Sequence, residues 1–276
     1  MIPRAHITAW RAVAPWPTDA QVEQDLVLSR ALVEIYSDPA LATNLAFRGG
    51  TALHKLYLSP PLRYSEDIDL VQVEAGPIGP VMTALRARLD PWLGEPRRKQ
   101  SEGRMTFIYR FDSEIQPVTP LRLKIEVNTR EHFAVLGYAR QTVAVDNPWF
   151  GGHAEVVTYP LEELLGTKLR AFYQRKKGRD LFDLVTALSR RPDLNRAKVV
   201  DCFLRYLDAS GDHVSRAEFE ANLDGKLADA AFHRDIQPLL ATPGGAAVRF
   251  DVSEAARAMQ AEFIALLPGE PWRGRV

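Results

Sequence analysis

The sequence predicts an α+β protein in two domains: a mixed β-sheet flanked by helices over residues 1–160, then an all-helical domain over residues 161–276. Two observations predict this division. Several segments before Pro160 alternate apolar and polar residues with the period of two that a half-buried strand requires. The periodic segments after Pro160 instead repeat their apolar residues every three or four positions, as amphipathic helices do.

The first domain opens with an expected extended arm, because residues 1–17 contain three prolines. Thr18 or Asp19 would cap the first helix, and Pro60 with Pro61 would end the short helix that follows a Gly-Gly-Thr turn. In order, we expect a helix from 18 or 19 to 36, a strand at 45–47, a helix at 51–58, a strand at 66–73, a helix at 78–93, a polar basic loop at 94–103, and strands at 105–111, 121–128 and 154–159.

The strand at 121–128 has the strictest alternation. Its apolar residues would face a core and its polar residues a polar cleft. The apolar set is Leu121, Leu123, Ile125 and Val127, and the polar set is Arg122, Lys124, Glu126 and Asn128.

In the second domain, a stripe of four large apolar residues predicts one long helix directly after Pro160. A basic turn interrupts the pattern before the next helix begins at Asp180. The stripe is Leu161, Leu165, Leu169 and Phe172, and further helices are expected at 195–209, 215–233 and 251–267.

Composition narrows the class of protein. Lys+Arg and Asp+Glu both number 35, so the net charge of zero argues neither for nor against a nucleic-acid partner, and only local patches can. The lone Cys202 excludes an internal disulfide and favours a reducing compartment; we expect it to be inert core. No signal-peptide core and no apolar run of about 18 residues is present, so we expect a cytoplasmic protein without a membrane partner.

Asp67 and Asp69 form the strongest candidate metal site. Residues i and i+2 of a strand point the same way and lie about 6.5–7 Å apart, so their carboxylates can converge on Mg²⁺. Glu126, on the polar face of its own strand, could serve as a third carboxylate that holds metal or deprotonates an attacking hydroxyl. The alternatives are a solvated strand end for the Asp pair and a Lys124–Glu126 surface pair for the third carboxylate.

Gly49-Gly50-Thr51 precedes a helix and is a candidate phosphate site. Glycines let backbone N–H groups approach a phosphate, and the Thr51 hydroxyl could bond a phosphate oxygen. The alternative is an ordinary turn, and no Gly-Lys-Ser/Thr follows as in a P-loop.

Together these motifs resemble a known family. Gly50-Thr51 followed by Asp67-Ile-Asp69 resembles the signature of the nucleotidyltransferase β superfamily. More narrowly, the chain resembles the AbiEii/AbiGii (MenT-like) toxins of type IV toxin–antitoxin and abortive-infection systems. The matching blocks, between about residues 45 and 190, are Phe47-Arg-Gly-Gly-Thr-Ala-Leu53, Arg63-Tyr-Ser-Glu-Asp-Ile-Asp-Leu70, Leu123-Lys-Ile-Glu-Val127, Leu161-Glu-Glu-Leu-Leu-Gly-Thr-Lys-Leu-Arg-Ala171 and Arg179-Asp-Leu-Phe-Asp-Leu184.

The resemblance implies a nucleotidyltransferase-like first domain and a helical domain that closes the nucleotide cleft. Asp67 and Asp69 would bind Mg²⁺ or Mn²⁺, Gly50 and Thr51 would hold the triphosphate of an NTP, and Lys168 would contact the phosphates. Asp183 has the alternative role of a structural cap. The expected catalytic set is Asp67, Asp69, Glu126 and Lys168, and the expected nucleotide-binding set is Arg48, Gly49, Gly50, Thr51, Ser65, Lys124, Lys168, Asp180 and Asp183.

Two further expectations concern basic residues. Lys168 follows Leu164 by four residues, at the edge of an apolar stripe, where it would reach a phosphate or else extend along the surface into solvent. A basic cluster in the interhelical turn could hold RNA, as could Arg97-Arg98-Lys99, although a solvated loop is the alternative. The cluster is Arg170, Arg175, Lys176, Lys177 and Arg179.

The resemblance implies a toxin that transfers NMP from an NTP to an RNA acceptor, the 3′ end of tRNA, and so blocks translation. It also implies a cognate antitoxin, whose direct binding is left open. The alternatives are a nucleotidyltransferase with a protein or small-molecule acceptor, and a non-catalytic module that binds NTP or RNA.

Overall fold

The computed structural model describes residues 2–242 and 248–274. These residues form two compact units, the first made of 2–159 and 240–242 and the second of 160–239 and 248–274. Residues 240–242, which the sequence assigns to the second domain, thus group with the first.

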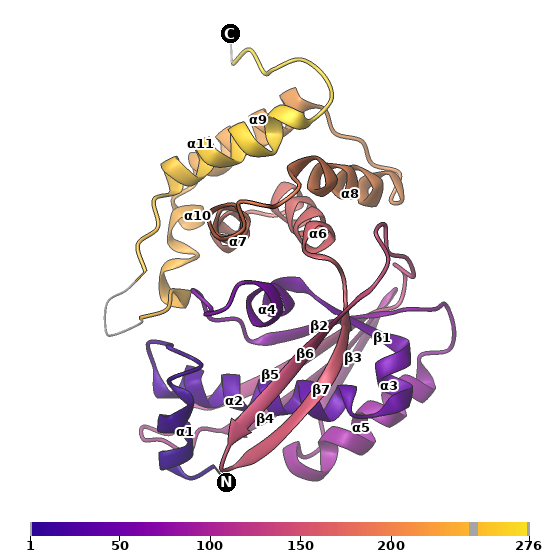
Figure 1. Ribbon diagram of the computed structural model, residues 1–276, viewed down its shortest axis with the longest axis vertical. Coiled ribbons are helices and arrows are strands. Elements are labelled where there is room, and N and C mark those ends of the chain that lie inside the picture. The colour runs from indigo at the N-terminus through magenta and orange to yellow at the C-terminus, as the bar shows by residue number, and fades with distance from the viewer. Residues whose placement is uncertain (1, 243–247, 275–276) are drawn as a thin grey trace. The chain divides into compact units, whose positions relative to one another are not determined.

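The first unit is built on a seven-stranded mixed sheet of order β3-β4-β5-β2-β1-β7-β6 (Figure 1). β2 pairs with β5 in parallel, as does β1 with β7, and the other neighbours are antiparallel. The predicted α+β class with a mixed sheet is confirmed. The elements are α1 (Arg4–Trp10), α2 (Asp19–Tyr36), α3 (Pro39–Asn44), β1 (Leu45–Arg48), α4 (Gly49–Ala52), the π-helical turn η1 (Leu53–Tyr57), β2 (Asp67–Gln72), α5 (Gly79–Leu93), β3 (Arg97–Ser101), β4 (Arg104–Asp112), β5 (Pro120–Asn128), β6 (Ala139–Asn147) and β7 (Phe150–Thr158).

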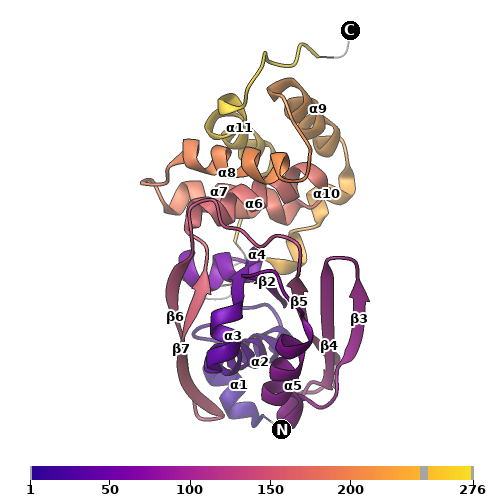
Figure 2. The ribbon, with the colours of Figure 1, turned by 90° about the vertical axis from the view of Figure 1, so that its right-hand side faces the viewer.

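One face of the sheet carries the core of this unit. α2 contacts β2, β5, β6 and β7, and α5 contacts β4; Figure 2 shows both helices on the same side of the sheet. The apolar residues of β2 and β5 on that face are buried, as their alternation predicts. They are Ile68, Leu70, Leu121, Leu123, Ile125 and Val127. The polar residues of the same strands therefore lie on the opposite face.

The start of α2 follows from its sequence. Thr18 accepts a hydrogen bond from the Gln21 backbone N–H while the Gln21 side chain accepts one from the Thr18 backbone, a capping box. The predicted helix of residues 18 or 19 to 36 is confirmed.

Two expectations for this unit are wrong, and one strand is missing from the prediction. Residues 1–17 contain a helix, α1, because the prolines flank rather than interrupt residues 4–10, and Ile7 and Trp10 are buried on it. The expected loop at 94–103 contains β3, whose residues are all exposed and so show no apolar alternation; it is held by backbone pairing to β4. β6 was not expected, and β7 begins at Phe150 rather than at residue 154.

The described part of the second unit consists of helices and connecting segments. The ring centroid of Phe172 lies 6.0 Å from that of Phe219 and 6.1 Å from that of Phe232. A Cβ at Gly166 would lie 2.6 Å from the Cys202 Cβ, so a glycine is needed where α6 and α8 pack most closely. The helices are α6 (Leu161–Gln174), α7 (Gly178–Arg190), α8 (Arg196–Asp208), α9 (Arg216–Leu227), α10 (Ala230–Arg234), η2 (Gln237–Leu239), α11 (Val252–Glu262) and η4 (Ile264–Leu266).

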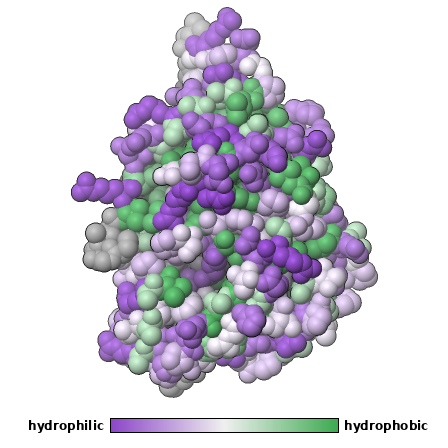
Figure 3. Space-filling view, in the orientation of Figure 1, coloured by the Kyte–Doolittle hydropathy of each residue, from purple (hydrophilic) through white to green (hydrophobic). Residues whose placement is uncertain are grey.

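None of the described helices is long and apolar enough to span a membrane. On the face shown in Figure 3, hydrophobic residues are scattered among hydrophilic ones and do not form one continuous band. Cys202 is buried, as predicted, and burial raises the pKa of its thiol to about 12.

Candidate active site

The Gly-Gly-Thr turn lies directly against the Asp-x-Asp strand. Gly49 follows β1 with φ of +82°, a left-handed conformation that favours glycine. A Cβ at Gly49 would lie 2.3 Å from Oδ2 of Asp69, so only glycine leaves room for this carboxylate against the turn. Arg48 is opposite Asp69 in the β1–β2 register and forms an ion pair with Glu131. The sequence therefore brings a candidate phosphate turn and a candidate metal ligand together.

Thr51 and Ser65 brace this arrangement. The Thr51 hydroxyl donates to the Asp67 backbone carbonyl at 2.5 Å and makes a second hydrogen bond with the Ser65 hydroxyl at 2.8 Å. Thr51 is only 2% exposed. In this structure the hydroxyl fixes the turn to the start of β2, and a contact between Thr51 and a phosphate stays a prediction. Ser65 belongs to the same brace.

The carboxylates of β2 and β5 face a shared lysine. In the parallel register, Asp67 lies opposite Lys124 and Asp69 opposite Glu126. The Lys124 ammonium is 3.3 Å from Asp67 Oδ2 and 3.1 Å from Glu126 Oε2. The remaining oxygen of Glu126 pairs with Arg104 at 3.0 Å. Lys124 thus supplies positive charge between the two strands.

The charges at this site shift two ionisation equilibria. Burial, together with the negative charges of Asp69 and Glu66, raises the pKa of Asp67 despite the neighbouring lysine. Burial alone would lower the pKa of Lys124, but the carboxylates of Asp67 and Glu126 outweigh it and raise that pKa. Neighbouring carboxylates on adjacent positions of a sheet repel, so the site favours a bound cation.

The residues present fit a divalent cation in part. Oδ1 of Asp67 is buried and has no hydrogen-bond partner, and carboxylate oxygens are the ligands that Mg²⁺ prefers. However, among residues 2–242 and 248–274 no three His, Cys, Asp or Glu side chains are grouped as metal ligands. Arg104 and Lys124 pair with the two oxygens of Glu126, and the role of Glu126 as a third metal ligand stays a prediction. The pair Asp67 and Asp69 remains the candidate.

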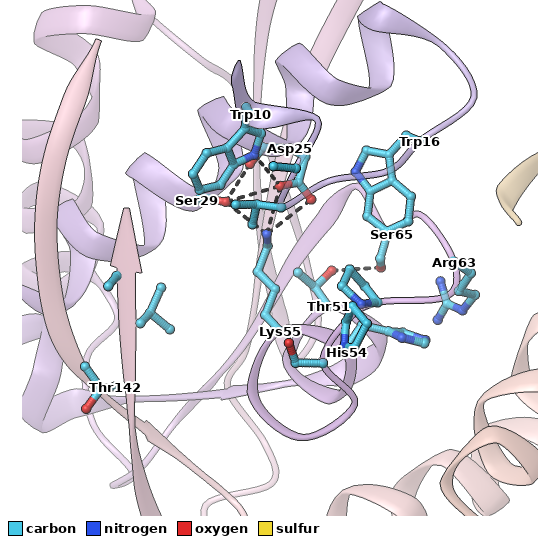
Figure 4. Close-up of a pocket in the computed structure, with 17 residues that line it drawn as sticks. Trp10, Trp16, Asp25, Ser29, Thr51, His54, Lys55, Arg63, Ser65 and Thr142 are labelled. Carbon is cyan, nitrogen blue, oxygen red and sulfur yellow. Dashed lines mark hydrogen bonds and ion pairs between the residues drawn. The ribbon is translucent and has the colours of Figure 1, made fainter. Parts of the chain in front are cut away.

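A pocket of about 360 Å³ adjoins the turn within the first unit, and Thr51 and Ser65 form part of its wall (Figure 4). Lys55 and Asp25 also line it, and the Lys55 ammonium lies 3.0 and 3.1 Å from the two carboxylate oxygens of Asp25. Trp10 donates its indole N–H to the same carboxylate at 2.9 Å. The volume is that of a small-molecule site, and π-helical turns such as the one carrying Lys55 are frequent at functional sites.

The sequence motifs do not indicate the ion pair of Asp25 and Lys55. These two residues lie 30 positions apart on two helices, and neither belongs to a motif. Asp25 is 3% exposed although its position in α2 looks like a polar one. The sequence offers one signal: Asp25 stands directly before the apolar run Leu26-Val27-Leu28 of a predicted helix. A carboxylate that is buried there requires a partner.

Lys168, Asp180 and Asp183 come together in the second unit. The Lys168 ammonium is 3.1 Å from Asp180 and 3.0 Å from Asp183, and both carboxylates are fully buried. Arg175 also pairs with Asp180, at 2.7 Å. Burial alone would raise the pKa of Asp180, but Lys168 and Arg175 outweigh it and hold that pKa below its usual value. Two positive and two negative charges balance.

This cluster corrects two alternatives raised by the sequence. Lys168 is 7% exposed, so it is not a lysine extending into solvent. Asp183 lies inside α7, whose N-cap residue is Lys177, so it is not a structural cap. Whether Lys168 contacts nucleotide phosphates stays a prediction.

The predicted RNA-binding cluster is largely matched by acidic side chains. Beyond the Arg175 pair, each lysine of the cluster has a carboxylate partner: Lys176 pairs with Asp229 at 3.6 Å and Lys177 with Asp235 at 3.3 Å. The guanidinium of Arg170 lies 5.0 Å from the ring centroid of Tyr206, and the Arg179 backbone N–H donates to Asp235. The partners Asp180, Asp229 and Asp235 reduce the net positive charge of the cluster.

A seven-stranded mixed sheet with a glycine turn set against an Asp-x-Asp strand is the arrangement expected of a nucleotidyltransferase. The chain matches the model of the family described as "Nucleotidyl transferase AbiEii toxin, Type IV TA system" over residues 30–254. It therefore belongs to the AbiEii nucleotidyltransferase toxin family of type IV toxin–antitoxin systems, as its motifs indicate.

Several solved structures resemble this fold, among them the two described next. The nucleotidyltransferase toxin MenT4 of Mycobacterium tuberculosis is 17% identical with a TM-score of 0.61, and the match covers 96% of this chain and 90% of that one. JHP933 of Helicobacter pylori is 16% identical with a TM-score of 0.54, covering 91% and 93%. No curated protein matches the chain. At these identities the structural likeness establishes the fold alone.

Proposed function

We propose that this protein is a metal-dependent nucleotidyltransferase that transfers NMP from an NTP to RNA, at the 3′ end of tRNA. A toxin acting in this way in the cytoplasm would block translation by modifying the end that must carry an amino acid, and a cognate antitoxin would restrain it. The closeness of Asp69 to the Gly49 turn carries the proposal. A cation held by this carboxylate would lie beside a phosphate that the backbone N–H groups of the turn could bind.

The reaction is an in-line displacement at the α-phosphorus. The acceptor hydroxyl oxygen forms a bond to phosphorus while the bond to the bridging oxygen of the β-phosphate breaks, and pyrophosphate leaves with that electron pair. Asp67 and Asp69 would hold Mg²⁺ or Mn²⁺, whose charge stabilises the phosphates. Lys124 orients the Asp67 carboxylate, and the hydroxyl proton passes to Glu126 or to solvent.

The finer assignments belong to this proposal as well. The residues of the first unit proposed to contact the nucleotide are Arg48, Gly49, Gly50, Thr51, Ser65 and Lys124. Lys168, with Asp180 and Asp183 holding its ammonium, is proposed to contact the nucleotide phosphates as well. These contacts are supported by the family to which the chain belongs.

The test uses purified protein, each α-³²P-labelled NTP, Mg²⁺ and total tRNA, followed by sequencing of tRNA 3′ ends. We expect label on tRNA, lost with EDTA and lost in Asp69→Asn. Asp146→Asn is the matched control, because Asp146 is an exposed carboxylate on β6 of the same sheet. Label on protein or on a small molecule would support a different acceptor. NTP that is bound but never transferred would support a non-catalytic module. Full transfer by Asp69→Asn would show that the metal assignment is wrong.

A further inference from the structure

The polar face of the sheet continues from the candidate carboxylates to the edge strand β3. Residues directly opposite each other on neighbouring strands lie on the same face. Following the registers outward from β2 gives two rows across four strands, each about 14 Å long at the usual strand spacing. One row is Asp69, Glu126, Thr106 and Lys99, and the other is Asp67, Lys124, Ile108 and Arg97. β3 is the outermost strand on its side of the unit (Figure 2).

The cations of this face fall into two groups. Those nearest the carboxylates are paired: Lys124 with Asp67 and Glu126, Arg104 with Glu126, and Arg122 with Glu66. Farther out, Arg97, Lys99 and Arg110 are exposed, and none of them forms an ion pair within the described ranges 2–242 and 248–274. Arg110 joins this face because it is opposite Arg122 in the β4–β5 register. The outer face thus has positive charge that the protein itself does not neutralise.

Protection of an exposed sheet edge is the simplest alternative. Edge strands often carry Lys and Arg that prevent pairing with another chain. The β3–β4 register ends at Arg97 opposite Ile108, so β4 has no β3 partner at Arg110, and this residue also lies at the edge of the sheet. Edge protection requires no affinity for RNA, so a measurement of RNA binding separates the two roles. Arg98 provides the comparison, since it lies on β3 opposite Phe107 and therefore on the other face.

We propose that Arg97, Lys99 and Arg110 bind phosphates of single-stranded RNA and lead its 3′ end along the sheet to Asp67 and Asp69. The surface fits a polyanion, because phosphate contacts need mobile, unpaired cations along a path. The 170–179 cluster fits less well, because Arg175, Lys176 and Lys177 are paired with carboxylates. This inference names the partner surface of the proposed nucleotidyltransferase site and rests on an RNA acceptor.

The test compares two charge-matched triple variants of the full chain. R97Q/K99Q/R110Q removes the outer cations of the carboxylate face. R98Q/R140Q/K198Q removes three exposed cations elsewhere, one of them on the same strand. Fluorescence anisotropy measures the Kd of a labelled unstructured RNA oligonucleotide and of tRNA from 50 to 200 mM KCl, without NTP. Circular dichroism checks that all variants are folded.

Losing three single-strand phosphate contacts should weaken binding by about 100-fold at 0.1 M salt. It should also make the negative slope of log K against log salt shallower by about 2. We expect R97Q/K99Q/R110Q to show this loss with both RNAs and the control variant to bind nearly as wild type. Equal losses in both variants would overturn the proposal, since any surface charge would then serve. Loss confined to tRNA would overturn the assignment of a single strand, and unchanged binding of both RNAs by R97Q/K99Q/R110Q would overturn the RNA surface itself.

The outcome is separable from that of the proposed function. If the face-specific loss occurs but no NTP is transferred to RNA, the RNA surface stands and the nucleotidyltransferase proposal fails. If transfer to tRNA occurs and R97Q/K99Q/R110Q neither binds nor transfers less well, the enzyme stands and this surface is wrong.

Discussion

Replacing Lys168 by methionine would remove one ammonium from between two fully buried carboxylates while keeping most of the side-chain volume. In the native cluster Lys168 and Arg175 balance Asp180 and Asp183. Lys168→Met leaves an excess negative charge in the interior, and breaking a buried ion pair in this way costs about 3–5 kcal/mol. That is a large part of a typical stability of about 5–15 kcal/mol. We therefore expect a strongly destabilised protein.

Thermal and urea unfolding, followed by circular dichroism, measure this effect. At about 2–4 °C per kcal/mol for a chain of this size, a loss of 3 kcal/mol lowers Tm by about 6–12 °C. The double variant K168M/D183N restores charge balance, because Arg175 still pairs with Asp180, and should regain part of the lost stability. Unfolding of Lys168→Met at the wild-type midpoint would refute the reasoning, and loss of nucleotidyl transfer at unchanged stability would make Lys168 a direct nucleotide contact.

Three further outcomes are expected. Gly49→Ala should reduce transfer at least 100-fold, since the new Cβ would displace Asp69, whereas Gly79→Ala, with open space around its Cβ, should retain wild-type activity in the same assay. The pKa of buried Lys226 is lowered by burial from 10.5 to about 8. The folded state therefore binds fewer protons than the unfolded state between pH 8 and 10.5. Over that range the free energy of unfolding in urea should rise with pH by up to about 3 kcal/mol relative to Lys226→Met. A difference between the two proteins that does not change with pH would contradict this. Cys202, buried with its thiol pKa raised to about 12, should react with a thiol reagent only after unfolding, and rapid labelling of the native chain would show that α8 opens.

The parts of the site that depend on strand periodicity could be predicted from the sequence. Period-two alternation places Asp67 and Asp69 on one face of β2, and that of β5 places Lys124 and Glu126 on one face as well. Periodicity does not state which strands are neighbours, so it could not show that Asp69 lies opposite Glu126. The Lys124 bridge between the strands depends on that pairing.

The missed features depend on contacts between distant segments. β3 has exposed residues throughout, so its strand is defined by pairing with β4 and not by its own pattern. The basic turn at 175–179 looked like an unpaired patch because Asp229 and Asp235, its partners, lie about fifty positions away. Charge in a sequence window shows what a segment carries, but only the fold shows what neutralises it.

The first unit includes a short segment that the ribosome makes late. Ala241 donates its backbone N–H to the Leu62 carbonyl at 2.8 Å, Thr242 donates to Pro15 at 2.9 Å, and Leu240 forms a β-bridge with Arg63. Residues 160–239 are synthesised between the sheet and these contacts. Since domains tend to fold as they emerge, we expect the segment that carries Arg63 and Ser65 to gain its last support only when translation has passed residue 242. A nascent chain that stalls before that point would contain Asp67 and Asp69 but not the contacts that residues 240–242 make with Pro15, Leu62 and Arg63.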